Sequence, residues 1–286
     1  MQRYRWVPTI IFIPFIYFIG WLIIQPLRTA LPYSYSQNLS LIGTFFSFFL
    51  FMILLSSWVR LRWKENKLYV ALGLSDYSKK ESFRFFLRGL STSLGLLSCL
   101  LFPLLLSPWA KWTADLNFNI VFNSFFLILA VGLVEEILFR GWLLVEMNLL
   151  IGSRWGLVIH AAIFSLVHMR LNLEFGALIG LFVGLFLLAL VLALMRKCDN
   201  GSLWGCVGLH GGLVGGWFVI SSGLVEFSSE TPGWLFGPGG TALNPLGGLL
   251  AIFLLILMLL YQRTELPMVR RPSKGARKAS SRGAHP

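Results

Sequence analysis

The sequence is poor in charged residues, and acidic residues are the scarcer kind. Aspartate and glutamate number 12 against 24 lysines and arginines, and charged residues make up 13% of the 286. Soluble domains carry about 25% charged residues. With 56% hydrophobic residues, the chain has too few polar side chains to cover a water-soluble fold. We therefore expect an all-α integral membrane protein.

Cysteine is also scarce. The three cysteines, Cys99, Cys198 and Cys206, have no CxxC spacing, and each lies in or beside a hydrophobic stretch. An odd number at such positions argues against a disulfide framework. We expect them to pack as small apolar side chains.

Long apolar stretches are what the sequence has in abundance. About 20 apolar residues are needed for a helix to cross a bilayer. Eight stretches meet or approach this length: Trp6–Gln25, Leu39–Val59, Leu90–Trp109, Phe118–Asn148, Trp155–Met169, Phe175–Met195, Leu203–Ser221 and Leu246–Tyr261. With no soluble domain between them, they predict one membrane domain over residues 1–262.

The basic residues predict the orientation, because Lys and Arg remain on the cytoplasmic side. If the N-terminus is cytoplasmic, 20 of the 24 fall in cytoplasmic segments, and only Arg28, Lys111 and Arg170 fall outside. The last one, Arg140, lies within a span. Eight spans then place both termini in the cytoplasm.

This asymmetry also accounts for the net charge of +12. The basic loop 60–88 and the tail 263–286, which we expect to be disordered, suit anionic lipid headgroups. Nucleic-acid binding is disfavoured because the basic residues flank spans. Within the loop, Tyr77–Arg88 mixes aromatic and basic residues, which fits either an interfacial helix or a simple topogenic cluster.

Two rows of glycine occur at four-residue spacing within spans. Such rows let helix backbones approach closely in lipid. They comprise Gly176, Gly180 and Gly184 in the sixth stretch and Gly208, Gly212 and Gly216 in the seventh. Close packing is the interpretation we favour.

Within the fourth stretch, three charges are the only ones between Ile120 and Val145: Glu135, Glu136 and Arg140. A charge at the centre of a span costs roughly 2.5–3.5 kcal/mol on insertion scales and by default marks a functional site. Glu136 and Arg140 are four residues apart, so they share a helix face and can form an ion pair. Glu135 points about 100° around the helix and remains available to react.

Three of the four histidines also lie in predicted spans. His160 lies near the cytoplasmic end of the fifth stretch, where it serves at most to cap or bridge helices. At about 1.5 Å rise per residue, Glu135, His168 and His210 reach a similar depth. A carboxylate and an imidazole that converge on one water form a general-base pair, and a second histidine can stabilise an oxyanion. Zinc binding and proton or ion relay are alternative uses of these groups, although no HExxH motif is present.

The motifs resemble a known family when taken in order. Glu135-Glu136-x-x-x-Arg140, Phe164-x-x-x-His168 and His210 in a glycine-rich helix are similar to the motif set of the CPBP family (CAAX protease and bacteriocin-processing, or Abi) of intramembrane proteases. The resemblance covers a core of about residues 118–221.

The resemblance implies residue roles. Glu135 and His168 would activate water for peptide cleavage, and His210 would lie on the oxyanion side. Glu136, Arg140 and Phe164 would support them. Metal-dependent and metal-free mechanisms have both been proposed for the family, and the missing zinc motif favours the metal-free one, with no cofactor. One position departs from the pattern: Val214 stands where the family has Asn or Asp, so half of the oxyanion pair is missing.

The sequence thus predicts an intramembrane endopeptidase that acts on a membrane-embedded or lipid-anchored protein or peptide. A non-proteolytic scaffold or immunity-type protein is the alternative that Val214 favours, and a proton-coupled transporter is a third. A bacterial plasma membrane or a thylakoid-type internal membrane would suit such a protein. The sequence does not indicate a particular substrate.

Overall fold

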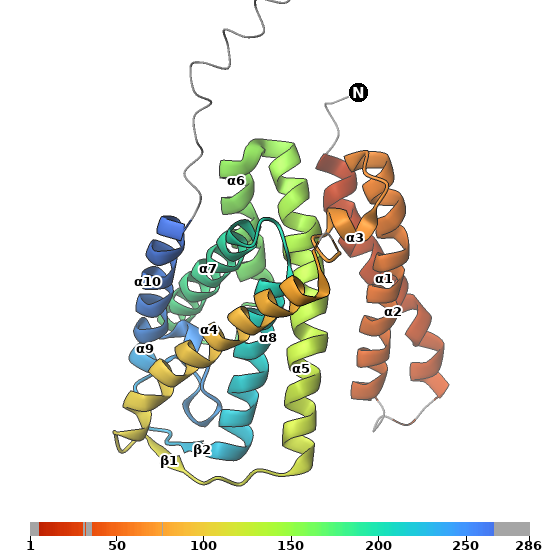
Figure 1. Ribbon diagram of the computed structural model, residues 1–286. Coiled ribbons are helices and arrows are strands. Elements are labelled where there is room, and N and C mark those ends of the chain that lie inside the picture. Colours follow the sequence, from red (N-terminus) through yellow and green to blue (C-terminus); the bar gives the residue numbers. More distant parts are fainter. Residues whose placement is uncertain (1–5, 31, 33–35, 76, 266–286) are drawn as a thin grey trace, which may run out of the picture.

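The computed structural model describes residues 6–30, 32, 36–75 and 77–265, and the part described is predominantly helical (Figure 1). The long helices are α1 (Trp6–Ala30), α2 (Ser36–Trp58), α4 (Lys79–Leu105), α5 (Phe118–Glu136), α6 (Leu144–Val167), α7 (Phe175–Cys198), α8 (Trp204–Val219) and α10 (Leu249–Glu265). Short helices are α3 (Leu68–Ala71), α9 (Gly233–Phe236), and the 3-10 turns η5 (Gly240–Ala242) and η6 (Pro245–Gly247).

Three π-helical segments extend the long helices: η2 (Val59–Trp63) follows α2, η3 (Ile137–Leu143) joins α5 to α6, and η4 (Ile220–Leu224) follows α8. Two short strands, β1 (Ala110–Trp112) and β2 (Val225–Phe227), pair antiparallel with Ala110 opposite Phe227. They connect the loops after α4 and α8, and the sequence did not predict them.

Six helical runs of the described chain are long and apolar enough to cross a membrane: Trp6–Arg28, Ile42–Trp63, Lys79–Leu105, Phe118–Val167, Phe175–Cys198 and Trp204–Leu224. The fourth run has 50 residues, but its backbone is non-helical at Gly152, where φ is 82°. There the chain reverses into a hairpin (Figure 1). The predicted helical membrane architecture is confirmed, whereas the count of eight spans stays a prediction.

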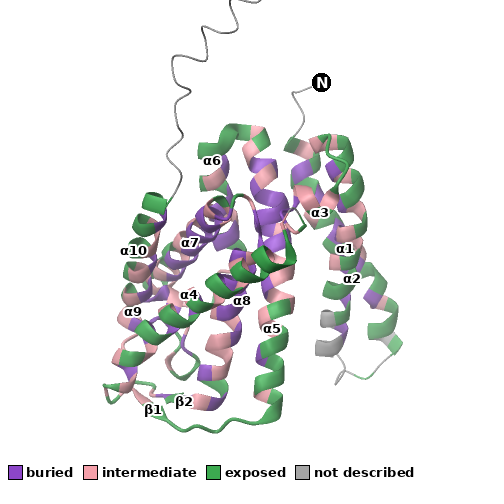
Figure 2. Cartoon of the chain, in the orientation of Figure 1, coloured by how far each residue is buried: buried purple, intermediate pink, exposed green. Residues whose placement is uncertain are grey.

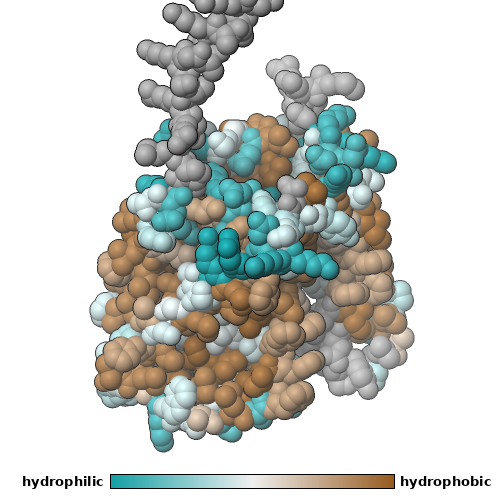
Figure 3. Space-filling view, viewed as in Figure 1, coloured by the Kyte–Doolittle hydropathy of each residue, from teal (hydrophilic) through white to brown (hydrophobic). Residues whose placement is uncertain are grey.

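The two ends of the described chain lie on the same side. α1 begins and α10 ends at the upper end of Figure 1. On the face shown in Figure 3, hydrophilic residues gather at this end and over the start of α4, and apolar residues cover most of the rest. This arrangement agrees with basic segments on one side of a bilayer, and the cytoplasmic assignment of that side stays a prediction. Residues 266–286, most of the expected tail, lie outside the described residues.

Of the two interpretations of Tyr77–Arg88, that of a separate interfacial helix is wrong, because these residues form no helix of their own. The topogenic cluster stays a prediction. α4 begins at Lys79 and continues without a break to Leu105, so it includes the expected third span. Ser78 and Glu81 form a capping box, in which each side chain accepts a hydrogen bond from the backbone N–H of the other residue. Such a box sets a helix start.

Glycines allow α8 to pack in the middle of the bundle, where buried residues are concentrated (Figure 2). A methyl group on Gly208 would collide with the carbonyl oxygen of Phe86, and one on Gly212 with the hydroxyl of Ser93, both on α4. Of the other row, Gly180 and Gly184 pack on η6, whereas Gly176 has open space around its Cα. The predicted close packing therefore holds for five of the six glycines. The three cysteines are free thiols, of which Cys206 is fully buried, Cys198 partly buried and Cys99 exposed.

α1 and α2 form a pair at one side of the bundle (Figure 1). They cross closely where Gly20 meets Gly43 and Ser47. Aromatic rings join the pair to the bundle: Phe12 stacks on Trp58 with ring centroids 4.2 Å apart, and both contact Trp142 of η3. The pair therefore touches the rest of the protein next to the predicted site.

Candidate active site

The two adjacent glutamates at the end of α5 have different surroundings. The side chain of Glu136 is completely buried, whereas that of Glu135 is 28% exposed. The π-helix η3 begins directly after them. π-helical turns in proteins are frequent at functional sites, and nothing in the sequence pattern predicted this one.

Glu136 is held by two partners. Its Oε1 accepts a hydrogen bond from Arg140 Nη1 at 2.8 Å, and it lies 2.8 Å from His210 Nδ1 of α8. The ion pair predicted from the four-residue spacing is therefore present. The oxygen that accepts from the guanidinium also accepts from the imidazole, so His210 Nδ1 donates to Glu136, which fixes the orientation of the ring.

Phe164 of α6 is a packing centre for these groups. The guanidinium of Arg140 lies 4.3 Å from the centre of the Phe164 ring, within the range of a cation–π contact. The same ring packs on His168 at 4.3 Å and on His210 at 5.9 Å between centroids. Phe164 thus positions a cation and both histidines, which gives physical content to the supporting role that the resemblance implied.

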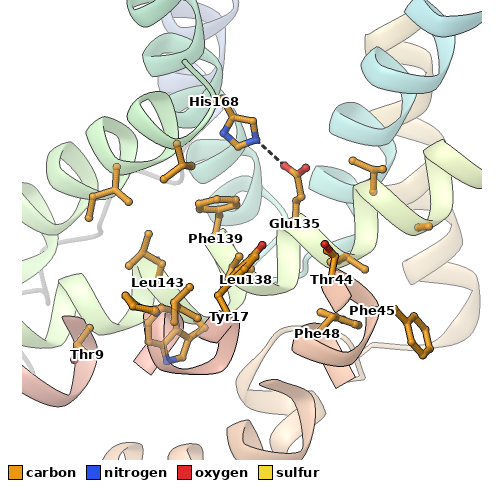
Figure 4. Close-up of a pocket in the computed structure, with 18 of the residues that line it drawn as sticks. Thr9, Tyr17, Thr44, Phe45, Phe48, Glu135, Leu138, Phe139, Leu143 and His168 are labelled. Carbon is orange, nitrogen blue, oxygen red and sulfur yellow. Dashed lines mark hydrogen bonds and ion pairs between the residues drawn. The ribbon is translucent and has the colours of Figure 1, made fainter. Parts of the chain in front are cut away.

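Glu135 meets His168 across the junction between α5 and the end of α6 (Figure 4). Glu135 Oε2 lies 3.1 Å from His168 Nε2, and His168 Nδ1 lies 2.7 Å from the carbonyl oxygen of Phe164. A carbonyl only accepts hydrogen bonds, so Nδ1 carries a proton. Nε2 and the carboxylate then share one further proton, either as imidazolium and carboxylate or as imidazole and carboxylic acid.

His210 joins the two glutamates. Its Nε2 lies 3.8 Å from Glu135 Oε2, and its side chain is 6% exposed. With Nδ1 donating to Glu136, Nε2 can donate to a developing oxyanion only when the ring is an imidazolium. The structure thus brings together Glu135, His168 and His210, which the sequence placed on three separate helices.

Val214 and Trp217 lie further along α8. Val214 is half-buried, one turn beyond His210. Trp217 lies three residues beyond Val214, but it does not replace the missing Asn or Asp as a donor. Its indole N–H donates to the carbonyl oxygen of Leu243 at 3.0 Å, and its ring stacks on Phe227. Trp217 is therefore used in packing away from the site.

The expectation for His160 was wrong. Its ring is fully buried, and within the described chain neither ring nitrogen has a hydrogen-bond partner. It therefore neither caps a helix nor bridges two helices. Nearby in sequence, Phe164 and His168 do reach the site from the same helix.

A large apolar pocket has Glu135 and His168 in its wall (Figure 4). Its volume is about 1100 Å³, and it lies between the α1–α2 pair on one side and α5, η3 and α6 on the other. Apart from Glu135 and His168, the lining side chains with polar atoms are Thr9, Tyr17, Thr44 and Trp142. The Glu135–His168 pair therefore faces a space suited to an apolar ligand.

Glu146 is a buried carboxylate that the sequence interpretation missed. Both tryptophan N–H groups of Trp58 and Trp63 donate to its Oε1, at 2.7 and 2.6 Å. Its Oε2 accepts from Arg62 Nη2 at 2.7 Å and from the Thr9 hydroxyl at 2.9 Å. These donors come from α1, α2 and η2. Glu146 was overlooked because its partners are 83 to 137 residues away in sequence.

Arg196 of α7, one of the 20 basic residues assigned to cytoplasmic segments, makes contacts that the sequence did not predict. Its Nη1 donates to the carbonyl oxygen of Arg140 in η3, and its Nε donates to the carbonyl oxygen of Gly201 at 3.0 Å. π-helical hydrogen bonding leaves carbonyl groups that need other donors, so Arg196 supports the segment that carries Arg140.

For metals, the sequence left zinc open beside the metal-free mechanism. Among the described residues, no group of three or more His, Cys, Asp or Glu side chains is arranged to hold a metal ion. The choice between the two mechanisms stays a prediction that chelation tests.

The fold and the site together define a helical membrane protein with a carboxylate–histidine cluster at an apolar pocket. Residues 117–215 match the family model of type II CAAX prenyl endopeptidase Rce1-like proteins. This match confirms the resemblance to the CPBP family, and the chain carries an Rce1-like domain that includes Glu135, His168 and His210. Residues 1–67 match a second family model, a domain of unknown function (DUF8676). No curated protein and no solved structure matches the chain.

Proposed function

We propose that this protein is an intramembrane endopeptidase that hydrolyses a peptide bond in a membrane-embedded or lipid-anchored protein or peptide. The observation that carries the proposal is the 3.1 Å contact between Glu135 Oε2 and His168 Nε2 in the wall of the apolar pocket. The Rce1-like domain supports the reaction class.

Glu135 is the general base in this mechanism. Its Oε1 has no hydrogen-bond partner among the described residues and is open to a water molecule. The carboxylate takes a proton from water as the oxygen attacks the peptide carbonyl, and His168, held by the Phe164 carbonyl, orients the carboxylate. The proton then passes to the leaving amine as the C–N bond breaks.

His210 stabilises the oxyanion in this mechanism. Its Nε2 lies 3.8 Å from Glu135 Oε2, and its Nδ1 lies 2.8 Å from Glu136 Oε1, so the ring is oriented toward the carboxylate that activates water. One oxyanion donor typically contributes about 10²–10³ in rate. With Val214 in place of a second donor, we expect slower turnover than in a protein that has both donors.

A non-proteolytic membrane scaffold is the second candidate. Two observations favour it: Val214 offers no hydrogen bond, and the Trp217 indole is engaged by Leu243. In that case the pocket and the charged cluster bind a partner without turnover.

The two candidate functions are separated by whether the protein creates new N-termini in host membrane proteins. The purified wild type and the Glu135→Gln and His168→Phe variants are incubated with a detergent-solubilised membrane fraction, and new N-termini are identified by mass spectrometry. His168→Phe keeps the ring that packs on Phe164 but removes both nitrogens. We expect new N-termini with the wild type alone.

The matched control is Glu174→Gln, which changes an exposed carboxylate at the start of α7 and should behave as the wild type. Cleavage by Glu135→Gln at the wild-type rate would refute the protease. If Glu135→Gln also rescues a strain that lacks the gene, the scaffold is the better interpretation.

A further inference from the structure

The N-terminal helix pair lies outside the Rce1-like match, yet it forms half of the reactive pocket. Lining residues from α1 and α2 face α5, η3 and α6 across the cavity. In Figure 4, Thr44 and Phe48 of α2 lie on the side of the cavity facing Glu135. The Rce1-like domain alone would therefore leave the reactive pair open to the surrounding lipid on this side.

The pocket is long as well as apolar. Along the α5–α6 side, its lining runs from Phe126 to Met147, which at about 1.5 Å rise per residue is roughly 30 Å. Glu135 lies near the middle of this run, so apolar wall extends in both directions from the reactive carboxylate. A ligand that fills the pocket has apolar groups on both sides of the bond that reacts.

The position of the helix pair is set by one buried charge. The Glu146 carboxylate has four hydrogen bonds of 2.9 Å or shorter, and all four donors belong to α1, α2 or η2. The side chain of Glu146 is 1% exposed. Four short bonds to a buried carboxylate fix distance and angle together, whereas apolar contacts alone permit sliding.

We propose that the N-terminal helix pair, α1 and α2, is the substrate-selecting wall of the enzyme. The ligand is an uncharged, apolar peptide segment of the substrate, bound between α2 and α5 with the scissile bond at Glu135. Glu146 is a positioning residue that sets the width of the pocket. This inference rests on the proposed endopeptidase function.

The first test measures binding without cleavage. The probe is a synthetic single-span peptide with a leucine-rich centre, labelled with a fluorophore and quencher, in bicelles. Its Kd is measured with protein carrying Glu135→Gln. Thr44→Trp, which puts an indole into the pocket next to Glu135, should weaken binding at least tenfold. Phe49→Trp places the same residue on a lipid-exposed position outside the pocket lining and should leave the Kd within twofold.

The second test measures selection by size. Values of kcat and KM are measured for peptides with Ala, Leu or Trp beside the scissile bond. The wild type is compared with a protein that carries Glu146→Gln alone. Glu146→Gln should raise KM and reduce the ratio of kcat/KM between the Leu and Trp peptides, with kcat changed less than threefold. A purely structural role would lower the amount of folded protein and leave this ratio unchanged.

The outcomes separate this inference from the proposed function. Equal binding by Thr44→Trp and Phe49→Trp, or no binding of the peptide to the Glu135→Gln protein, overturns the substrate wall. An unchanged size ratio in Glu146→Gln overturns the positioning role. The peptide could also bind in a Thr44-dependent manner while the wild type cuts none of the peptides. In that case the helix pair is a binding site, and the proposed endopeptidase function is refuted.

Discussion

The buried pair Glu136–Arg140 gives the sharpest prediction about stability. Both side chains are completely buried, and the carboxylate also holds His210. Removing one partner of a buried ion pair leaves an uncompensated charge and costs about 3–5 kcal/mol. Arg140→Met removes the cation with little loss of volume, so it should destabilise the protein by about this amount.

The double variant is the more informative one. Glu136→Gln removes the charge but retains an amide oxygen that accepts from His210 Nδ1. Replacing both members of a buried pair by neutral groups is often close to neutral. We expect Glu136→Gln/Arg140→Met to cost about 1–2 kcal/mol, so the two substitutions are coupled by about 2 kcal/mol or more.

Thiol labelling of the protein in detergent during heating measures this effect. Cys206 is fully buried, so its reaction with a maleimide dye reports unfolding, and Cys99→Ser removes the exposed thiol that reacts in the folded state. For a chain of this size, about 1 kcal/mol shifts Tm by roughly 2–4 °C. The Arg140→Met protein should therefore melt roughly 10 °C below the wild type. A double variant that melts below Arg140→Met would refute the reasoning.

Four further predictions concern single groups. His160→Leu removes buried nitrogens that have no partner in the described chain, so it should raise stability by about 1–2 kcal/mol in a melting assay. Cleavage should be retained, and a loss of cleavage would show that His160 takes part in the reaction. Burial raises the pKa of Asp199 from 3.8 to about 6 despite its ion pair with Arg88. Because the folded state binds this proton more tightly, stability should fall as pH rises from about 4 to about 6, and Asp199→Asn should flatten that change in melting curves. Val214→Asn should speed cleavage of a substrate identified by N-terminal sequencing by about tenfold or more; an unchanged rate would mean that the oxyanion is stabilised elsewhere. A zinc chelator should leave that cleavage unchanged, and inhibition reversed by added zinc would contradict the metal-free mechanism.

The site could be predicted from the sequence because charge in lipid is costly. Glu135, Glu136 and Arg140 stood out against an apolar stretch, and their spacing assigned the ion pair to Glu136 and left Glu135 to react. The depth estimate then grouped His168 and His210 with Glu135. These inferences need only helix geometry, which a long apolar stretch fixes closely.

What the sequence did not predict depends on contacts between distant segments. Thr9, Arg62 and Trp63 each resemble ordinary residues near the end of a span, and only the fold brings them to Glu146. Glu146 itself lies one residue beyond the stretch in which the sequence drew attention to charges. The same limit applies to His160, whose lack of a partner depends on what packs around it.

The pattern of apolar residues also did not predict where helices begin and end or where they are distorted. The capping box of Ser78 and Glu81 extends α4 through the basic segment, which the hydropathy had divided from the third span. The π-helix η3 continues an apolar stretch without a change in composition. Its stability depends on tertiary donors such as Arg196, which binds the Arg140 carbonyl from another helix.

The acidic residues of the run Phe118–Val167 are distinguished by their partners. Glu136 is bonded to Arg140 and Glu146 to Arg62, so each buried carboxylate is held by a guanidinium. The ion-pair partners of Glu135 within the described chain are imidazoles, at 3.1 and 3.8 Å, and Glu135 is the one that lines the pocket. An imidazole can give up or accept a proton near neutral pH, whereas a guanidinium cannot. Proton transfer is therefore open to Glu135 and closed to its two neighbours, which serve instead to hold His210 and the N-terminal helices in place around it.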